Sequence, residues 1–190
     1  MPTADLSPGV GAPLADLELV ITRIFDAPRE LVFEAWAEPE RAVRWWGPQG
    51  FTTAYCEMDV RPGGTYRVCM RSPEGTEHWQ RGVCREVVAP ERLVFTFAWE
   101  DAEGKPGHET VVTVTLAEYG GKTKLTLHQA VFETVTERDL HQGGWESALE
   151  CLAVYLAGLK RAVQHVLKEV ERWSTRSFRM TNGSPPASSS

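Results

Sequence analysis

Residues 36–51 read WAEPERAVRWWGPQGF, and three of the seven tryptophans of the chain lie within the first eleven positions of this stretch. Pro39 suits the first turn of a helix, where its missing N–H costs nothing. Gly47-Pro48 then ends that helix after Trp46, because Gly tolerates a left-handed cap and Pro cannot continue the turn. Adjacent helical residues point about 100° apart, so Trp45 and Trp46 cannot enter one core in the same way. We expect Trp46 to lie near a pocket and Trp45 to pack structurally or at an interface.

The residues on either side of this stretch follow the periods of strands and helices. Residues 17–25 are rich in β-branched side chains and predict a first strand. Asp26 is a candidate N-cap for a helix whose apolar positions are 31, 32, 35 and 36. Short turns rich in Gly and Pro follow, and they join antiparallel neighbours. The period of two after residue 51 predicts six strands, over 51–61, 64–72, 77–88, 92–100, 109–118 and 122–131.

The first predicted hairpin, around residues 61–64, allows two registers. A two-residue loop would place Cys56 opposite Cys69, within reach of a disulfide. A three-residue loop instead aligns two apolar rows, with Cys56, Met58 and Val60 opposite Met70, Val68 and Tyr66. Register follows the apolar face, so we expect the three-residue loop and free thiols.

The chain ends in a long amphipathic helix. Residues 136–139 could start it, but Gly143-Gly144 is unfavourable inside a helix, so the regular run is expected to begin nearer residue 143. One face is then apolar for about five turns, at Trp145, Ala148, Leu149, Leu152, Tyr155, Leu156, Leu159 and Val163. This face is the one obvious cover for the apolar side of the meander.

Five segments are characteristic as a set: Ala27-Pro28-x-Glu30-x-Val32-Phe33-x-Ala35-Trp36, Trp45-Trp46-Gly47-Pro48, Asp59-x-Arg61-Pro62-Gly63-Gly64, Pro90-Glu91-Arg92-Leu93-Val94-Phe95 and Gly144-Trp145. With the order of elements, they resemble the helix-grip superfamily of polyketide cyclases, StAR-related lipid-transfer proteins and birch-pollen allergens. Within it, residues 17–160 are similar to the group related to the activator of heat-shock protein 90 ATPase.

This resemblance implies an α+β fold in which a curved antiparallel sheet of about seven strands wraps a long C-terminal helix. Two short helices follow the first strand, and a cavity lies between sheet and helix. We expect a flexible leader over 1–14, a helix-grip domain over 15–160, a helix extension over 161–178 and a disordered tail over 179–190. The group shares no catalytic residues that can be transferred, and its fold does not select one function.

Composition excludes several classes of protein. The net charge is −6, but residues 160–179 carry six Lys or Arg against two Glu, which leaves −10 for the rest of the chain. Such a balance disfavours nucleic acid as a general partner, although the basic helix could bind a protein partner or a second copy. No apolar run is long enough to span a membrane, and the N-terminus does not resemble a secretory signal, so a cytoplasmic protein is expected. Neither the four cysteines nor the histidines show metal-ligand spacing, so no metal or cofactor is expected.

Aromatic side chains are the stronger functional signal. No catalytic triad or phosphate-binding loop is present, and alternation alone leaves open whether His78, Gln80 and Gly82 or their neighbours face inward. The candidate ligand pocket comprises Trp46, Tyr66, Met70, His78, Phe97, Trp99, Trp145 and Leu149. An apolar cavity with few polar groups suits binding more than bond-making.

The leading hypothesis is therefore a non-catalytic protein that binds a small hydrophobic ligand, aromatic or lipid-like. One alternative is a cyclase or dehydratase that uses His78 or Tyr66 as the proton donor. The other is a chaperone-activator-like interaction module or stress-response protein, which would use its acidic body or its basic last helix.

Overall fold

The computed structural model describes residues 13–181 of the chain. A short 3-10 helix, η1 (Leu14–Leu17), precedes strand β1 (Leu19–Phe25) and the helices α1 (Arg29–Ala37) and α2 (Pro39–Ala42). Six strands follow, β2 (Thr52–Met58), β3 (Thr65–Arg71), β4 (Glu77–Val88), β5 (Arg92–Trp99), β6 (Thr110–Tyr119) and β7 (Lys122–Ala130). The last element is the 47-residue helix α3 (Val135–Thr181). This α+β order confirms the predicted one.

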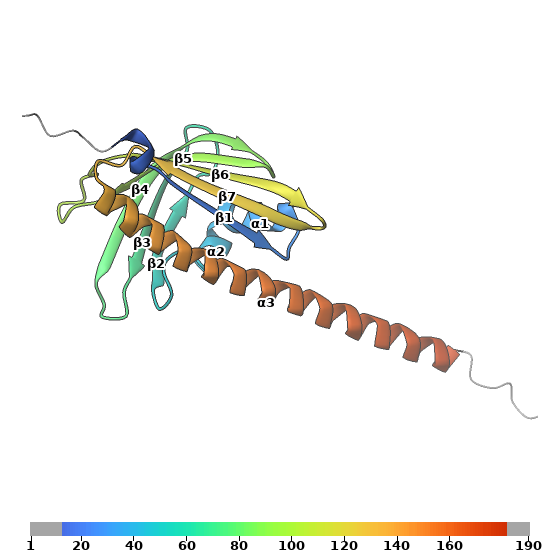
Figure 1. The fold of residues 1–190 in the computed structure, drawn as a ribbon. Helices are drawn as coiled ribbons and strands as arrows, with labels where there is room; N and C mark the ends of the chain where they lie inside the picture. Colours follow the sequence, from blue (N-terminus) through green and yellow to red (C-terminus); the bar gives the residue numbers. More distant parts are fainter. Residues whose placement is uncertain (1–12, 182–190) are drawn as a thin grey trace, which may run out of the picture.

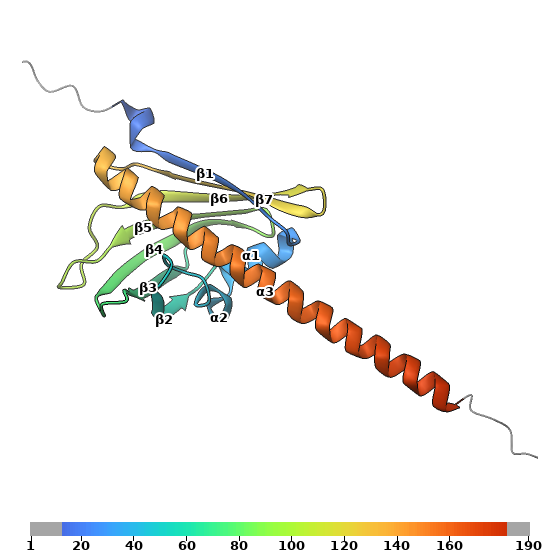
Figure 2. The ribbon, with the colours of Figure 1, turned by 60° about the horizontal axis from the view of Figure 1, so that its bottom comes forward.

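All seven strands form one antiparallel sheet in the order β1-β7-β6-β5-β4-β3-β2. Strands β2 to β7 are the predicted meander, and β1 closes it by pairing with β7. The sheet curves around the first half of α3, while the second half extends well past the sheet (Figure 1). The view turned by 60° shows the same crossing and the same projection (Figure 2).

The core lies between the concave face of the sheet and the first half of α3. Leu149, Leu152 and Leu156 of the helix are buried, and they belong to the same hydrophobic cluster as Leu125 and Leu127 of β7. All five are at most 2% exposed. Full burial of a leucine side chain contributes about 1.5–3 kcal/mol, so this layer anchors the helix to the sheet.

The β2–β3 hairpin has a longer loop than predicted. Met58 lies opposite Tyr66 and Cys56 opposite Val68, so the expected three-residue register was wrong by two residues. The loop is wider because its backbone pairs with β4: the Gly63 N–H donates to the Cys84 carbonyl at 2.7 Å. The apolar rows still share one face, because a shift by two preserves the direction of each side chain.

The cysteine prediction does not depend on that shift. Tyr55, not Cys56, lies opposite Cys69, and all four cysteines are free thiols. Burial raises the pKa of the Cys56 thiol to about 11, so this group stays protonated near neutral pH.

The two short helices differ from expectation at their ends. Asp26 caps neither of them, since Pro28 occupies the N-cap of α1, and the Asp26 carboxylate instead pairs with Lys160 at 2.7 Å. Helix α2 ends at Ala42 rather than Trp46, and turns lead from it to Gly47. Gly47 has a φ of +120°, as its proposed role at a chain reversal requires.

Helix α3 begins eight residues before the expected start. The Thr134 hydroxyl accepts a hydrogen bond from the Glu137 N–H at 3.1 Å and thereby caps the helix. This cap offsets part of the cost of Gly143 and Gly144, about 1 kcal/mol each relative to Ala. The helix also continues to Thr181, past the expected boundary at 178. Most of the expected leader, and the expected tail from 182 onward, lie outside the described residues.

Candidate functional site

A cavity of about 440 Å³ lies between the concave face of the sheet and the first turns of α3. This volume falls in the range typical of small-molecule sites, about 300–1,000 Å³. Its walls are formed by Trp46, Gly47, Pro48, Phe51, Met70, His78, Gln80, Phe97, Trp99, Leu140, His141, Gly144, Trp145 and Ala148. Among these described residues none is Asp, Glu, Lys or Arg.

Three neighbouring strands provide the sheet side of the cavity. Met70 of β3 lies opposite His78 of β4, and Gln80 of β4 lies opposite Trp99 of β5. Directly paired residues of antiparallel strands project from the same face, and so do residues two apart. The structure thus places His78 and Gln80 inward, which alternation alone did not decide.

The other walls come from α3 and from the turn after α2. Cavity residues of α3 recur at 140, 141, 144, 145 and 148, the spacing of one helical face. Gly144 leaves open space there, since a Cβ at this position would meet nothing within 4 Å. Gly47 is tighter, because a Cβ would come within 3.0 Å of the Met70 Sδ.

A hydrogen-bonded chain fixes the orientation of Trp145. Its indole Nε1–H donates to Gln129 Oε1 at 2.7 Å, and Gln129 Nε2 donates to Thr110 Oγ1 at 2.7 Å. The Thr110 hydroxyl in turn donates to the Phe97 carbonyl at 3.1 Å. The polar edge of Trp145 is therefore satisfied, and the ring itself remains as an apolar wall of the cavity.

His141 is held neutral at the cavity rim. Its Nε2 accepts a hydrogen bond from the Trp99 indole N–H at 3.0 Å, which assigns the ring proton to Nδ1. Burial lowers the pKa of His141 to about 4, against a smaller opposing effect of the Glu137 carboxylate. The ring also contacts the edge of Phe97, with centroids 5.0 Å apart. At neutral pH His141 therefore adds no charge to the cavity.

Gln80 is the one cavity residue with a buried side-chain acceptor that lacks a hydrogen-bond partner among the described residues. The residue is 1% exposed. An unpaired buried acceptor costs about 1–3 kcal/mol. A residue that served only to fill the apolar core would not carry this cost.

Six of the eight residues predicted to form the pocket are brought together by this cavity: Trp46, Met70, His78, Phe97, Trp99 and Trp145. Leu149 is not among its walls; it is 1% exposed and belongs to the hydrophobic core. Tyr66 lines only a separate void of about 20 Å³, and its hydroxyl donates to the Thr96 carbonyl at 2.9 Å. Of the two expected proton donors, only His78 lines the large cavity.

The two adjacent indoles are both buried, but they have different roles. Trp45 is 3% exposed, and its Nε1–H donates to the Ala35 carbonyl at 2.8 Å, which ties the turn to α1. Trp46 contacts Trp145 across the cavity, with ring centroids 5.9 Å apart. The expectation that one indole reaches a cavity therefore applies to Trp46.

Sequence reasoning missed Gln80, His141, Phe51 and Gly144. Gln80 had been linked to His78 by alternation, so it follows once His78 is known to face inward. His141 and Leu140 were missed because the helix was expected to begin after them. Gly144 was treated as an unfavourable helix residue, although its missing side chain leaves room in the cavity.

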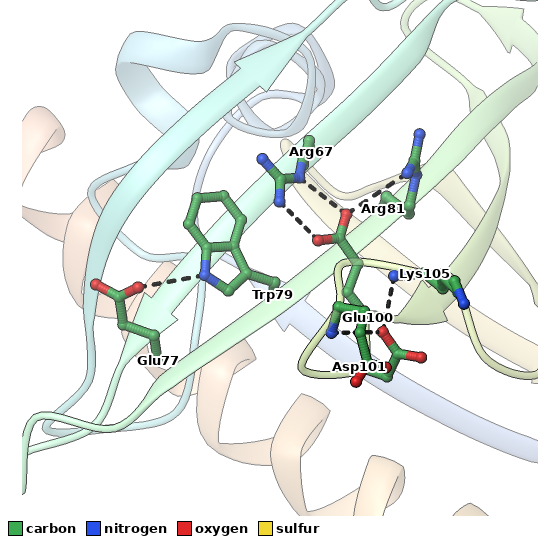
Figure 3. A network of polar contacts seen from close by, with 8 residues as sticks. Arg67, Glu77, Trp79, Arg81, Glu100, Asp101 and Lys105 are labelled. Atoms are coloured by element: carbon green, nitrogen blue, oxygen red, sulfur yellow. Dashed lines mark hydrogen bonds and ion pairs between the residues drawn. The ribbon is translucent and has the colours of Figure 1, made fainter.

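The opposite face of the same strands carries a polar network (Figure 3). Glu100 has a side chain only 1% exposed, and it accepts two hydrogen bonds from Arg67, at 2.8 and 2.7 Å. Arg81 lies 3.8 Å from the same carboxylate, and the Arg67 guanidinium stacks on Trp79. The hydrogen bonds from Arg67 hold the pKa of Glu100 below its usual value. This network joins β3, β4 and the end of β5 behind the cavity.

The match to a family model identifies the family of the chain. Residues 26–157 match the model described as Activator of Hsp90 ATPase homolog 1-like protein. The chain belongs to this family. It is thereby a member of the helix-grip superfamily, as the sequence motifs indicated. The match covers strands β2 to β7 and the first half of α3, including every residue that lines the cavity, and it begins just after β1.

Solved structures agree with this assignment. The AHSA1 protein from Silicibacter pomeroyi has a TM-score of 0.68 and 27% identity, over 74% of this chain and 97% of its own. A protein from Nitrosomonas europaea has a TM-score of 0.66 and 26% identity, over 77% of this chain and 98% of its own. A protein from Arthrobacter aurescens has a TM-score of 0.70 and 25% identity, over 79% and 91%. No curated protein matches the chain, and no helix within residues 13–181 is long and apolar enough to cross a membrane.

Proposed function

We propose that this protein binds a small, uncharged hydrophobic ligand in the cavity between the sheet and α3. The observation that carries the proposal is the combination of about 440 Å³ of space with walls that are mainly apolar and include five Trp and Phe rings.

The chemistry of the walls supports an uncharged ligand. The cavity residues carry no carboxylate, ammonium or guanidinium group, and His141 is neutral near pH 7. A charged ligand would therefore lose its hydration without gaining an opposite charge. Phe97 and Trp99 have ring centroids 5.0 Å apart at an interplanar angle of 84°, which creates an aromatic corner suited to a flat ring.

Two adjacent glycines of α3 provide a matched test. Gly144 lines the cavity and Gly143 does not, while a Cβ at either position meets nothing within 4 Å. We expect Gly144→Leu to fill part of the cavity and to weaken binding of a flavone or polycyclic aromatic probe at least tenfold. Gly143→Leu should change the affinity by less than about twofold. Both variants should fold, because leucine is a better helix former than glycine by about 0.8 kcal/mol.

Isothermal titration calorimetry with a panel of aromatic and lipid probes measures these affinities. If the wild-type chain binds none of the probes, or if both glycine variants bind as tightly as the wild type, the proposed function is wrong.

The cytoplasm is the proposed location. The four free thiols support it, because reduced cysteines are the rule in that compartment.

A further inference from the structure

Two buried glutamines of this fold have opposite hydrogen-bonding states. Gln129 is 0% exposed, and its amide is bonded at both ends, to Trp145 and Thr110. Gln80 is 1% exposed, and its Oε1 has no partner among the described residues. Nearly all buried polar atoms in proteins have a partner, so the free acceptor of Gln80 needs a reason.

The surroundings of Gln80 suggest that reason. Gln80 is part of the cavity wall, and its neighbour across the ladder, Trp99, is part of the same wall. The next inward residue of β4 is His78, whose ring lies 6.4 Å from that of Trp99. A flat ligand held against these rings would lie beside the Gln80 side-chain amide, whose buried oxygen has no other bond to make.

We propose that the ligand is a flat, uncharged aromatic molecule with a hydroxyl group that forms a hydrogen bond with the side-chain amide of Gln80. The inference rests on the proposed function, and it adds the class of ligand and the residue that selects it. A site that leaves a buried acceptor unpaired rejects analogues that lack the donor. Gln80 would therefore discriminate hydroxylated aromatic molecules from their parent hydrocarbons.

Flavone and its 6-, 7- and 4′-monohydroxy derivatives are suitable probes, since they differ by a single donor. Calorimetric titration of the wild type should show at least one hydroxyflavone binding about tenfold more tightly than flavone, as one additional buried hydrogen bond allows. In Gln80→Met, which keeps the side-chain length and removes the amide, that preference should fall to about twofold or less. Gly143→Leu, which lies outside the cavity walls, is the control and should keep the preference.

Thermal unfolding of the ligand-free chain provides a second test. Gln80→Met should raise Tm by about 2–4 °C, because it removes an unpaired acceptor without opening a space. Gln129→Met should lower Tm, because it leaves the Trp145 indole N–H without its acceptor. Equal binding of flavone and all three hydroxyflavones would overturn the inference alone. A lowered Tm in Gln80→Met would overturn it too, and failure of every probe to bind would overturn the proposed function.

A different observation, on α3, supports a second inference. Apolar residues recur on this helix with a strict seven-residue repeat, at Leu149, Leu152, Leu156, Leu159, Val163, Val166, Val170 and Trp173. The sheet buries the first three. The last four, which we call the α3 extension face, are 57–72% exposed on the part of the helix that projects past the sheet (Figures 1 and 2).

The seven-residue repeat and the placement of the charges favour helix α3 of a second copy of the chain as the partner. A sustained seven-residue repeat of apolar residues is the signature of helix pairing. Arg161 and Lys168 fall at the position of the repeat that points furthest from this seam, so the basic charge of the helix does not oppose pairing there.

The body of the protein determines the direction of pairing. The same helix face is covered by its own sheet up to Leu156, and a parallel second helix would overlap that sheet. An antiparallel helix avoids this overlap, and it directs the basic end of each helix toward the acidic body of its partner. The pairing would begin beyond Lys160, whose bond to Asp26 at 2.7 Å marks the point where the helix leaves the body.

We infer that two copies of this chain associate through the α3 extension face as an antiparallel helix pair, centred near Lys168. Sedimentation equilibrium of the full chain should show a dimer, and Val166→Glu with Val170→Glu should convert it to a monomer. Lys168→Glu, on the outward side, should leave the dimer intact. Leu167→Cys lies beside the two-fold axis and should cross-link the dimer under oxidation, which the wild-type chain should not do.

A wild-type chain that stays monomeric up to about 100 μM would contradict this inference, since a helix pair weaker than that is not a stable association. A dimer that persists in the double glutamate variant would place the interface elsewhere. A dimer in which Val166→Cys cross-links and Leu167→Cys does not would indicate parallel helices and overturn the arrangement.

Discussion

At the scale of single residues, hydrogen-bonding and packing partners keep the side chains of the cavity uncharged. His141 shows this most clearly, because it is uncharged near neutral pH although it lies at the rim of the cavity. Its Nε2 is occupied by the Trp99 N–H at 3.0 Å, and its ring is packed against Phe97. Protonation would place a second proton at Nε2, opposite a donor, which opposes the charged form.

The pH dependence of folding follows from that arrangement. The pKa of His141 is about 4 in the folded chain, compared with about 6.5 for an unperturbed histidine. Between these values the unfolded state binds more protons, so the free energy of unfolding falls as the pH drops from about 6.5 to about 4. With allowance for partial exposure of the ring, the loss is on the order of 2 kcal/mol.

Chemical denaturation of the wild type and of His141→Gln between pH 4 and 7.5 checks this. Glutamine can still accept from Trp99 but does not titrate, so the variant should lose less stability over that interval. Parallel stability profiles of the two proteins would show that His141 is not held neutral by the fold. All other side chains are common to the two proteins and cancel in the comparison.

Residue-scale features differ in how far sequence could predict them. The aromatic walls were predictable, because Phe97 and Trp99 alternate toward one end of a strand and Trp145 begins an apolar stripe. The inward direction of His78 was not predictable, since both alternating sets on β4 mix polar and apolar side chains. The free acceptor of Gln80 is a property of its three-dimensional neighbours and has no sequence signal of its own.

At the scale of secondary-structure elements, strands β3, β4 and β5 form a rigid wall with two different faces. The inner face carries Met70, Gln80 and Phe97, and the outer face carries the network centred on Glu100 (Figure 3). Glu100 is nearly fully buried and bonded twice to Arg67. The outer network therefore fixes the strands whose other side chains line the cavity.

We expect Glu100→Gln to destabilise the fold by about 1–3 kcal/mol, because it removes a charge from a buried, bidentate pair and leaves Arg67 with a weaker acceptor. Thermal unfolding measures the change. Glu77 is a suitable control from the same network, since its pairs with Arg71 and Trp79 are exposed. Glu77→Gln should shift Tm far less, and equal shifts in the two variants would contradict a structural role for the buried pair.

Element boundaries were predicted less well than element types. The period of two predicted all six meander strands, but not the wide loop between β2 and β3, whose backbone bonds to Cys84 of a third strand. Such a bond is non-local, so no local pattern predicts it. Helix α3 begins early because the Thr134 hydroxyl caps it at Glu137, ahead of the Gly143-Gly144 pair that disfavours helix. The cap favours a helix here and the glycines disfavour one, and sequence alone does not show which effect is larger without the tertiary contacts.

At the scale of the whole molecule, one long helix serves two regions. Its first half covers the curved sheet and one wall of the cavity, and its second half leaves the body with the same apolar face exposed (Figure 1). The family match ends at residue 157, close to the point where the helix leaves the body. The cavity thus belongs to the family fold, whereas the α3 extension face lies beyond the matched segment.

The central claim is that the space between sheet and helix is a binding site for a flat, uncharged aromatic molecule. A crystal structure of the full chain with the tightest-binding hydroxyflavone tests it most directly. We predict electron density for the ligand between Trp99, Trp145 and Gly144, with its hydroxyl oxygen within hydrogen-bond distance of the Gln80 side-chain amide. A cavity filled by rearranged side chains, or a ligand bound elsewhere on the molecule, would contradict the claim.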